Sequence, residues 1–155
     1  MAQEAGPQMH VGQQLRNLGG VTLSGEFKHI VLPDSPSQHL VVFTFSPGCP
    51  ACQASQTQWA LLAQQLERRT GWRVLWVSRD PISLTSSYCA QHEIPSAEVL
   101  AEPTYATHLQ LALGFVPNTV AVGPGGVIEK VWTGKMNAEQ WQQVFSYFGA
   151  EAPHL

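Results

Sequence analysis

The sequence has few charged residues and no long hydrophobic run. Of its 155 residues only 12% are charged, with 8 Lys and Arg against 11 Asp and Glu. So few basic residues exclude a broad basic surface of the kind that binds nucleic acid or acidic membranes. No stretch approaches the roughly 18 to 20 apolar residues that a membrane-spanning helix needs. We therefore expect one domain of ordinary size, with no nucleic-acid partner and no membrane span.

The amino-terminal segment lacks the features of a secretory signal. Residues 1–12 have neither a basic start nor an apolar core, and both are needed for export by that route. We expect residues 1–12 to form a flexible segment and residues 13–150 to form the domain. A mature or truncated start behind Met1 is the alternative, in which case a leader or membrane anchor has been removed.

Cysteine is also scarce, and its number is odd. Three cysteines do not make the framework of a small disulfide-stapled secreted domain, where even numbers prevail. Cys49 and Cys52 form one Cys-x-x-Cys pair, and Cys89 stands alone. For Cys89 we favour a small buried hydrophobe over a regulatory or resolving thiol. The histidines show no ligand spacing, and zinc needs about four ligands, so we expect no metal.

The Cys-x-x-Cys pair lies between two strong secondary-structure signals. Residues 40–45 are a continuous apolar run typical of a buried strand, and the residues after Cys52 have a helical pattern. A helix that begins here directs unpaired N–H groups and its positive dipole end at the first sulfur, which favours a thiolate. We therefore predict that Cys49 is a nucleophile and that Cys52 closes a redox-active disulfide with it, without a separate cofactor.

The other predicted elements alternate between strands and helices. Trp59, Leu62, Ala63 and Leu66 share one helical face, and residues 73–78 form a second buried strand, so a right-handed parallel crossover is expected. Before the cysteines we expect a hairpin of residues 21–23 and 27–32 and a turn at 33–37. After the second strand we expect a helix over 83–91, a short strand over 97–101 and a helix over 105–113 closed by Gly114. The chain then ends with a hairpin of 119–122 and 127–132 and a final helix that has a capping box at Asn137 and Gln140.

This order of elements resembles the thioredoxin fold. The class is α/β, with a central mixed β-sheet flanked by helices, an N-terminal β-hairpin and an insertion before a cis-proline. More narrowly, the chain is similar to exported thiol-disulfide oxidoreductases of the TlpA, ResA and DsbE type. The motifs are residues 45–52, 114–119 and 125–134, and the wording Phe-Ser-Pro-x-Cys-Pro-x-Cys also resembles MauD-type members.

The resemblance implies an enzyme that exchanges disulfides with protein substrates, more as a reductase than as an oxidase of folding proteins. It implies a periplasmic or otherwise extracytoplasmic location and an upstream redox partner, with a membrane electron donor as one candidate. In that family the proline at the position of Pro117 is cis and lies against the cysteine pair. Such a bond leaves the backbone of Val116 free for an extended peptide. Pro50, Ala51, Val116 and Pro117 are therefore the expected substrate-binding residues.

Three departures from the family leave the acid-base partner of Cys52 open. Gly48 stands where Trp is usual, Ser55 where several relatives carry glutamate, and Phe43 where thioredoxin has a buried aspartate. The candidates that remain for proton transfer are water, a tyrosine, and a carboxylate of the insertion such as Glu98 or Glu102.

Two other classes of function fit the sequence less well. A peroxidase of the peroxiredoxin type needs a Pro-x-x-x-Thr-x-x-Cys loop, and Pro47 is too close to Cys49 for that. A copper-delivery module of the Sco type needs Cys-x-x-x-Cys and a distant histidine ligand. The spacing here is one residue short, although His92 and His108 are possible ligands.

Overall fold

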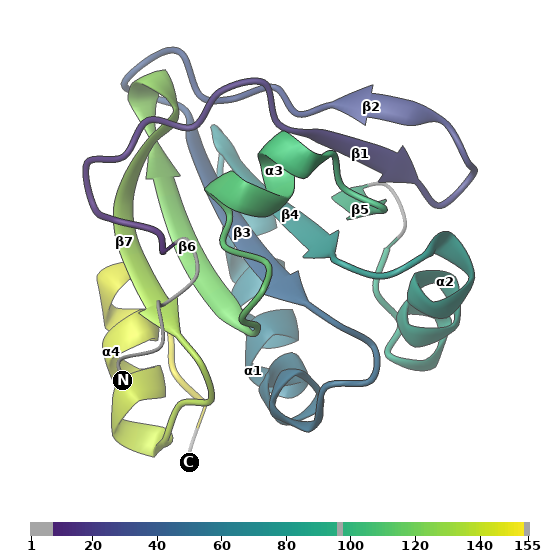
Figure 1. The fold of residues 1–155 in the computed structure, drawn as a ribbon. Coiled ribbons are helices and arrows are strands. Elements are labelled where there is room, and N and C mark those ends of the chain that lie inside the picture. Colours follow the sequence, from purple (N-terminus) through teal and green to yellow (C-terminus); the bar gives the residue numbers. More distant parts are fainter. Residues whose placement is uncertain (1–7, 96–97, 154–155) are drawn as a thin grey trace, which may run out of the picture.

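The centre of the molecule is a seven-stranded mixed β-sheet with strand order β2-β1-β5-β4-β3-β6-β7 (Figure 1). We describe residues 8–95 and 98–153 from a computed structural model. The strands are β1 (Gly19–Thr22), β2 (Phe27–His29), β3 (His39–Phe45), β4 (Trp72–Ser78), β5 (Val99–Ala101), β6 (Asn118–Gly123) and β7 (Val127–Thr133). The predicted α/β class with its N-terminal hairpin is confirmed.

The parallel part of the sheet places two strand ends side by side. Strands β3 and β4 are parallel over their whole length, from His39 opposite Trp72 to Phe45 opposite Ser78. Helix α1 (Pro50–Glu67) connects them, and helix α2 (Ile82–Gln91) connects β4 to the parallel strand β5. The residues that follow β3 and β4 therefore meet at one edge of the sheet, which is where open α/β sheets carry their sites.

Helices cover both faces of this sheet. Helices α1 and α4 (Ala138–Tyr147) lie on one face, and the short helix α3 (Tyr105–Gln110) crosses the other (Figure 1). Beneath α1, the buried rings of Phe43 and Trp59 stack at 5.1 Å, and Phe43 meets Trp76 edge-on at 4.7 Å. The predicted capping box of the last helix, formed by Asn137 and Gln140, is present.

The segment after β5 corrects one expectation. The helix predicted over 105–113 ends at Gln110, and Ala112 rather than Gly114 takes a left-handed conformation, with φ of 49°. Leu111 and Leu113 are both fully buried. Residues two apart point to different sides of a helix, so a continued helix could not bury both leucines against the sheet. The chain turns instead, and the turn leads directly to β6.

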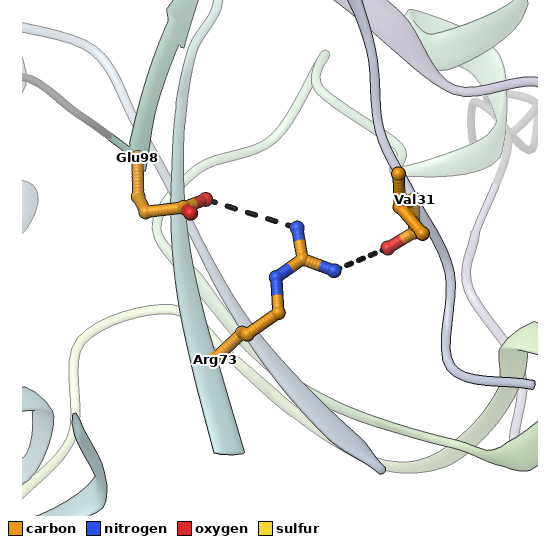
Figure 2. Close-up of polar contacts among 3 residues, drawn as sticks. All are labelled: Val31, Arg73 and Glu98. Carbon is orange, nitrogen blue, oxygen red and sulfur yellow. Dashed lines mark hydrogen bonds and ion pairs between the residues drawn. The ribbon is translucent and has the colours of Figure 1, made fainter. Parts of the chain in front are cut away.

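Arg73 fixes the amino-terminal half of β4 to its surroundings. Its guanidinium donates a hydrogen bond to the carbonyl of Val31 and lies 3.8 Å from the Glu98 carboxylate (Figure 2). The connection after β2 and the start of β5 are thereby tied to the same strand. Both partners of the ion pair are more than one-third exposed, so water screens the charge interaction and its contribution to stability is small.

The chain after α4 is held against the far end of α1. Gln65 and the backbone of Glu151 exchange two hydrogen bonds, of 2.9 Å and 2.8 Å. Arg69 donates a further hydrogen bond of 2.7 Å to the carbonyl of Gly149. These contacts lie at the opposite end of α1 from the cysteine pair.

Two sequence expectations fall partly beyond the part of the chain described here. Residues 1–7 of the expected flexible segment and Ala97 of the expected strand lie outside the described residues. From Gly12 onward the backbone contacts strand β7, because the Gly12 N–H donates to the Ile128 carbonyl at 2.8 Å. Within residues 8–95 and 98–153, the helices are too short or too polar to cross a membrane.

Candidate dithiol active site

Cys49 is the N-cap residue of helix α1. Its backbone is extended, with φ of −93° and ψ of 113°, and Pro50 follows at the first helical position. The N–H of Cys52 donates to the Cys49 sulfur at 3.1 Å. The half-buried Cys49 sulfur therefore lies at the N-terminus of α1, where it caps the helix.

Cys52 lies one helical turn further along and is fully buried. The pKa of its thiol is raised to about 12, mainly by burial and also by the hydrogen bond with the Cys49 side chain. The Ser46 backbone and the Arg79 charge act in the opposite direction and lower it. Both cysteines are free thiols in this structure. The described state is therefore the dithiol form, with one accessible and one enclosed sulfur.

The loop before β6 lies directly against Cys49. The Val116–Pro117 peptide bond is cis, as predicted. The Cys49 thiol is 3.9 Å from the carbonyl oxygen of Val116, at hydrogen-bonding distance for sulfur. Asn118 holds this loop by donating to the Phe115 carbonyl at 2.7 Å. The structure thus brings the Val116–Pro117 edge to the cysteine pair, and the intervening Pro50 and Ala51 lie at the surface beside it.

An aromatic and amide environment replaces the buried carboxylate that is absent beneath the site. Phe43 belongs to the aromatic cluster under α1, and the Tyr88 hydroxyl donates to the Gln56 side-chain oxygen at 2.9 Å. Burial raises the pKa of Tyr88 above its ordinary value, and the neighbouring cysteine sulfurs add to this effect. Tyr88 is therefore a neutral hydroxyl beside the pair at physiological pH.

Cys89 is also enclosed. It is 4% exposed, and burial raises its pKa to about 11. Such a thiol is protonated and inaccessible at neutral pH, which agrees with the favoured interpretation of a small buried hydrophobe.

The structure places both candidate carboxylates of the insertion in other contacts. Glu98 lies at the amino-terminal end of the parallel strands, where it pairs with Arg73 (Figure 2). Glu102 accepts a hydrogen bond from the Ile82 N–H at 3.0 Å, at the start of α2. Of the side chains considered for proton transfer, a tyrosine, Tyr88, lies near Cys52.

Three polar residues at this sheet edge were not singled out from the sequence. The Ser46 hydroxyl donates a short hydrogen bond to the Asp80 carboxylate, and the Ser46 carbonyl accepts from the Cys49 N–H at 3.0 Å. Arg79 donates from Nη1 to the carbonyls of Leu113 and Gly114. Their position was available as a signal, because Arg79 and Asp80 directly follow the second buried strand and the carboxyl ends of parallel strands converge.

A largely apolar groove adjoins the cis-proline loop. Its volume is about 890 Å³. Tyr105 and Phe115, which line it, are unusually exposed for aromatic residues, at 77% and 58%. The other residues along the groove include Leu109, Asn118 and Thr133. Asn118 and Phe115 flank Val116 and Pro117 in the chain, so residues on both sides of the cis-proline line the groove.

Solved structures identify the class to which this fold belongs. The chain has a thioredoxin-like fold and superposes on the thioredoxin domain of a thiol-disulfide oxidoreductase from Bacteroides vulgatus with a TM-score of 0.69 and 14% identity, over 91% of this chain and 99% of the other. A secreted thiol-disulfide isomerase from Corynebacterium glutamicum gives a TM-score of 0.70 and 17% identity, with 87% and 83% of the two chains covered.

A third solved structure shares this fold. It is a secreted Mycobacterium tuberculosis disulfide oxidoreductase homologous to E. coli DsbE, with a TM-score of 0.61, 16% identity and coverage of 84% and 93%. The structural neighbours include DsbE-like thiol-disulfide oxidoreductases of the thioredoxin-like superfamily, and at 14–17% identity they show that this chain shares their fold. No protein-family model matches the chain, and no curated protein matches it by sequence.

Metal-ligating side chains are dispersed across the described part of the molecule. Among residues 8–95 and 98–153, His, Cys, Asp and Glu nowhere gather in threes in a geometry that could hold a metal ion.

Proposed function

We propose that this protein is a thiol-disulfide oxidoreductase that reduces disulfides in protein substrates through Cys49 and Cys52. The observation that carries the proposal is the asymmetry of the pair. The accessible sulfur of Cys49 accepts an N–H at the start of α1, and the fully buried Cys52 lies one turn behind it.

In the first step the Cys49 thiolate attacks one sulfur of a substrate disulfide. A bond forms between Cys49 Sγ and that sulfur, the substrate S–S bond breaks, and the other substrate sulfur leaves as a thiolate that takes up a proton. The main chain of Val116, 3.9 Å from Cys49 Sγ at its carbonyl oxygen, is placed to receive an extended substrate segment beside the reacting sulfurs.

In the second step Cys52 gives up its proton and attacks Cys49 Sγ. The Cys49–Cys52 disulfide forms, the mixed disulfide breaks, and the second substrate sulfur leaves as a thiolate. Two electrons have moved from the protein to the substrate. An upstream dithiol partner must then return the Cys49–Cys52 pair to the reduced form.

The resemblance of the Cys-x-x-Cys segment to TlpA-type proteins supports the reducing direction. A strongly oxidising pair owes its high potential to a stabilised reduced form, so the reduction potential of this pair decides between the two directions. An oxidase of folding proteins is the alternative direction for the same chemistry.

An extracytoplasmic setting fits this function. Two structural neighbours are described as secreted oxidoreductases or isomerases, and protein disulfides persist mainly in oxidising compartments. We infer that the substrates are exported proteins and that the electrons come from a partner dithiol, for which a membrane donor is one candidate.

The reduction potential of the pair tests the proposal. The protein is equilibrated in graded thiol buffers, quenched by alkylation, and the free thiols are counted by mass, with a Cys89→Ser variant as a control that leaves two reporting thiols. We expect a value near that of thioredoxin, about −270 mV. The Cys49→Ser variant should lose disulfide exchange by at least about a hundredfold, and Cys89→Ser should keep it.

Two results would contradict the proposal at different levels. A potential near −120 mV would replace the reductase with an oxidase while keeping the exchange chemistry. If the Cys49–Cys52 disulfide forms in none of the buffers, the protein is not an oxidoreductase that uses this pair.

A further inference from the structure

Arg79 occupies the position where the two central parallel strands end. It is the first residue after β4, and its backbone N–H donates to the Phe45 carbonyl at 3.1 Å. This bond continues the pairing of β3 with β4 by one residue. Phe45 is followed within four residues by Cys49, so the main chain of Arg79 is fixed against the segment that delivers the nucleophile to the helix.

The Arg79 side chain reaches across to the loop that carries the cis-proline. Its Nη1 atom donates to the Leu113 carbonyl at 3.1 Å and to the Gly114 carbonyl at 3.3 Å. These carbonyls immediately precede Phe115 and Val116. One guanidinium therefore connects the end of β4 to the loop whose Val116 carbonyl lies beside the Cys49 sulfur.

The charge of Arg79 also acts on the buried sulfur. It lowers the pKa of Cys52 and so opposes part of the increase that burial causes. The other charged residue at this strand end, Asp80, has its carboxylate hydrogen-bonded to the Ser46 hydroxyl. Among the described residues, Arg79 forms no ion pair that would neutralise it.

We propose that Arg79 is a positioning residue of the dithiol site, which holds the loop before the cis-proline against the end of β4 and supplies positive charge to the Cys52 sulfur. The proposal rests on the function inferred above. It assigns to one side chain two roles, a tether for the substrate-facing edge and a counter-charge for the resolving thiolate.

Two substitutions separate the effect of the Arg79 charge from the effect of its hydrogen bonds to the loop. Arg79→Gln removes the charge, and Arg79→Lys keeps the charge but loses the planar group that contacts two carbonyls. In Arg79→Gln we expect Cys52 to titrate at higher pH, and release of substrate from the mixed disulfide at fixed pH to slow about threefold or more. In Arg79→Lys we expect a near-normal Cys52 titration with a higher KM for a peptide disulfide.

Arg73→Gln is the matched control. Arg73 lies near the other end of β4, and its guanidinium also donates to a backbone carbonyl, that of Val31 (Figure 2). We expect this variant to lose stability comparably while its thiol titration, substrate release and KM stay at wild-type values. Circular dichroism on all three variants verifies that each is folded.

The outcomes distinguish this proposal from the function on which it rests. If Arg79→Gln titrates and releases substrate like the wild type, or if Arg73→Gln changes the site equally, the role of Arg79 is overturned. If the wild type performs no disulfide exchange, the proposed function fails, and the thiol titration still tests the electrostatic role of Arg79 by itself.

Discussion

The three cysteines of this chain occupy two kinds of environment. Cys49 is half-buried and accepts an N–H at the start of α1. Cys52 and Cys89 are buried, with pKa values raised to about 12 and about 11 by burial. Thiolate, not thiol, is the reactive species. Burial therefore separates one reactive sulfur from two that react only when the protein moves or when a partner sulfur is already in contact.

Alkylation should reveal this difference residue by residue. We expect iodoacetamide at pH 7.5 to modify Cys49 of the reduced protein at least about tenfold faster than Cys52 or Cys89, because Cys49 is more exposed and burial keeps the other two thiols protonated. Peptide mass spectrometry after short exposures measures each site. Equal rates at Cys49 and Cys89 in the folded protein would contradict the environments described here.

Sequence alone could identify the cysteine pair but not its polar neighbours. Cys-x-x-Cys between a buried strand and a helix is a local pattern, so Cys49 and Cys52 were accessible to prediction. Arg79 was indicated only by its place directly after the second buried strand. Tyr88 reaches the site through the contact of α2 with α1, and no spacing in the chain indicates such a contact.

At the scale of elements, the turn between α1 and β4 is the most constrained connection. Gly71 there has φ of 85°, and a Cβ atom at this position would lie 2.1 Å from the Ser37 carbonyl oxygen. Gly25 in the first hairpin has a similar φ of 94°, but no atom lies within 4 Å of its would-be Cβ. Both glycines need a left-handed backbone conformation, but only Gly71 has another atom close to the position of a Cβ.

Substitution of both glycines by alanine should separate these two effects. We expect Gly25→Ala to reduce the free energy of unfolding by about 1 kcal/mol, from left-handed strain alone. Gly71→Ala should cost about 3 kcal/mol or more, because the backbone near Ser37 must also move. Urea denaturation measures both, and equal losses would show that the contact with Ser37 relaxes freely.

Helices with one continuous apolar face were predicted better than the segment whose helical propensity conflicts with the burial of its leucines. The long helix after the cysteines has a continuous apolar face from Trp59 to Leu66 and lies where that pattern placed it. The segment after Tyr105 has helical propensity, yet it must bury both Leu111 and Leu113. Packing against the sheet decided its boundary, and propensity did not contain that information.

At the scale of the whole molecule, the redox state changes how stability depends on pH. In the reduced protein Cys52 and Cys89 are protonated in both folded and unfolded chains below pH 9, the ordinary thiol pKa. Above pH 9 the unfolded chain loses these protons first, because burial raises the folded-state pKa values to about 12 and about 11. The unfolded state is then favoured, so stability falls as pH rises through this window.

We therefore expect the denaturation midpoint of the reduced protein to fall more steeply between pH 9 and pH 11 than that of the oxidised protein, in which Cys52 cannot ionise. Urea midpoints of both forms at half-unit intervals of pH provide the measurement. A Cys52→Ala variant should show the shallower slope of the oxidised form. Parallel curves for the two redox states would contradict the assignment of a raised pKa to Cys52.

The topology of the whole sheet was predictable because its parts are connected in order along the chain. A strand, a helix and a second strand form a right-handed parallel unit with few alternatives. The Gly123–Gly126 turn similarly joins β6 to β7 as an antiparallel pair. The groove beside Phe115 was not predictable, since it arises where α3, the cis-proline loop and strand β7 meet in space.

The hydrogen bonds between Gln65 and Glu151 determine where an artificial linker would leave the molecule. Helix α1 runs from Pro50, beside Cys49, toward Gln65, a separation of about 22 Å along its axis. A biotin or a gold-binding tag joined through the backbone near Glu151 would therefore sit on the side remote from the sulfurs. Protein immobilised on an electrode or sensor chip in this orientation would present Cys49 to the flowing solution, so its exchange with injected substrates could be followed on a single layer of molecules.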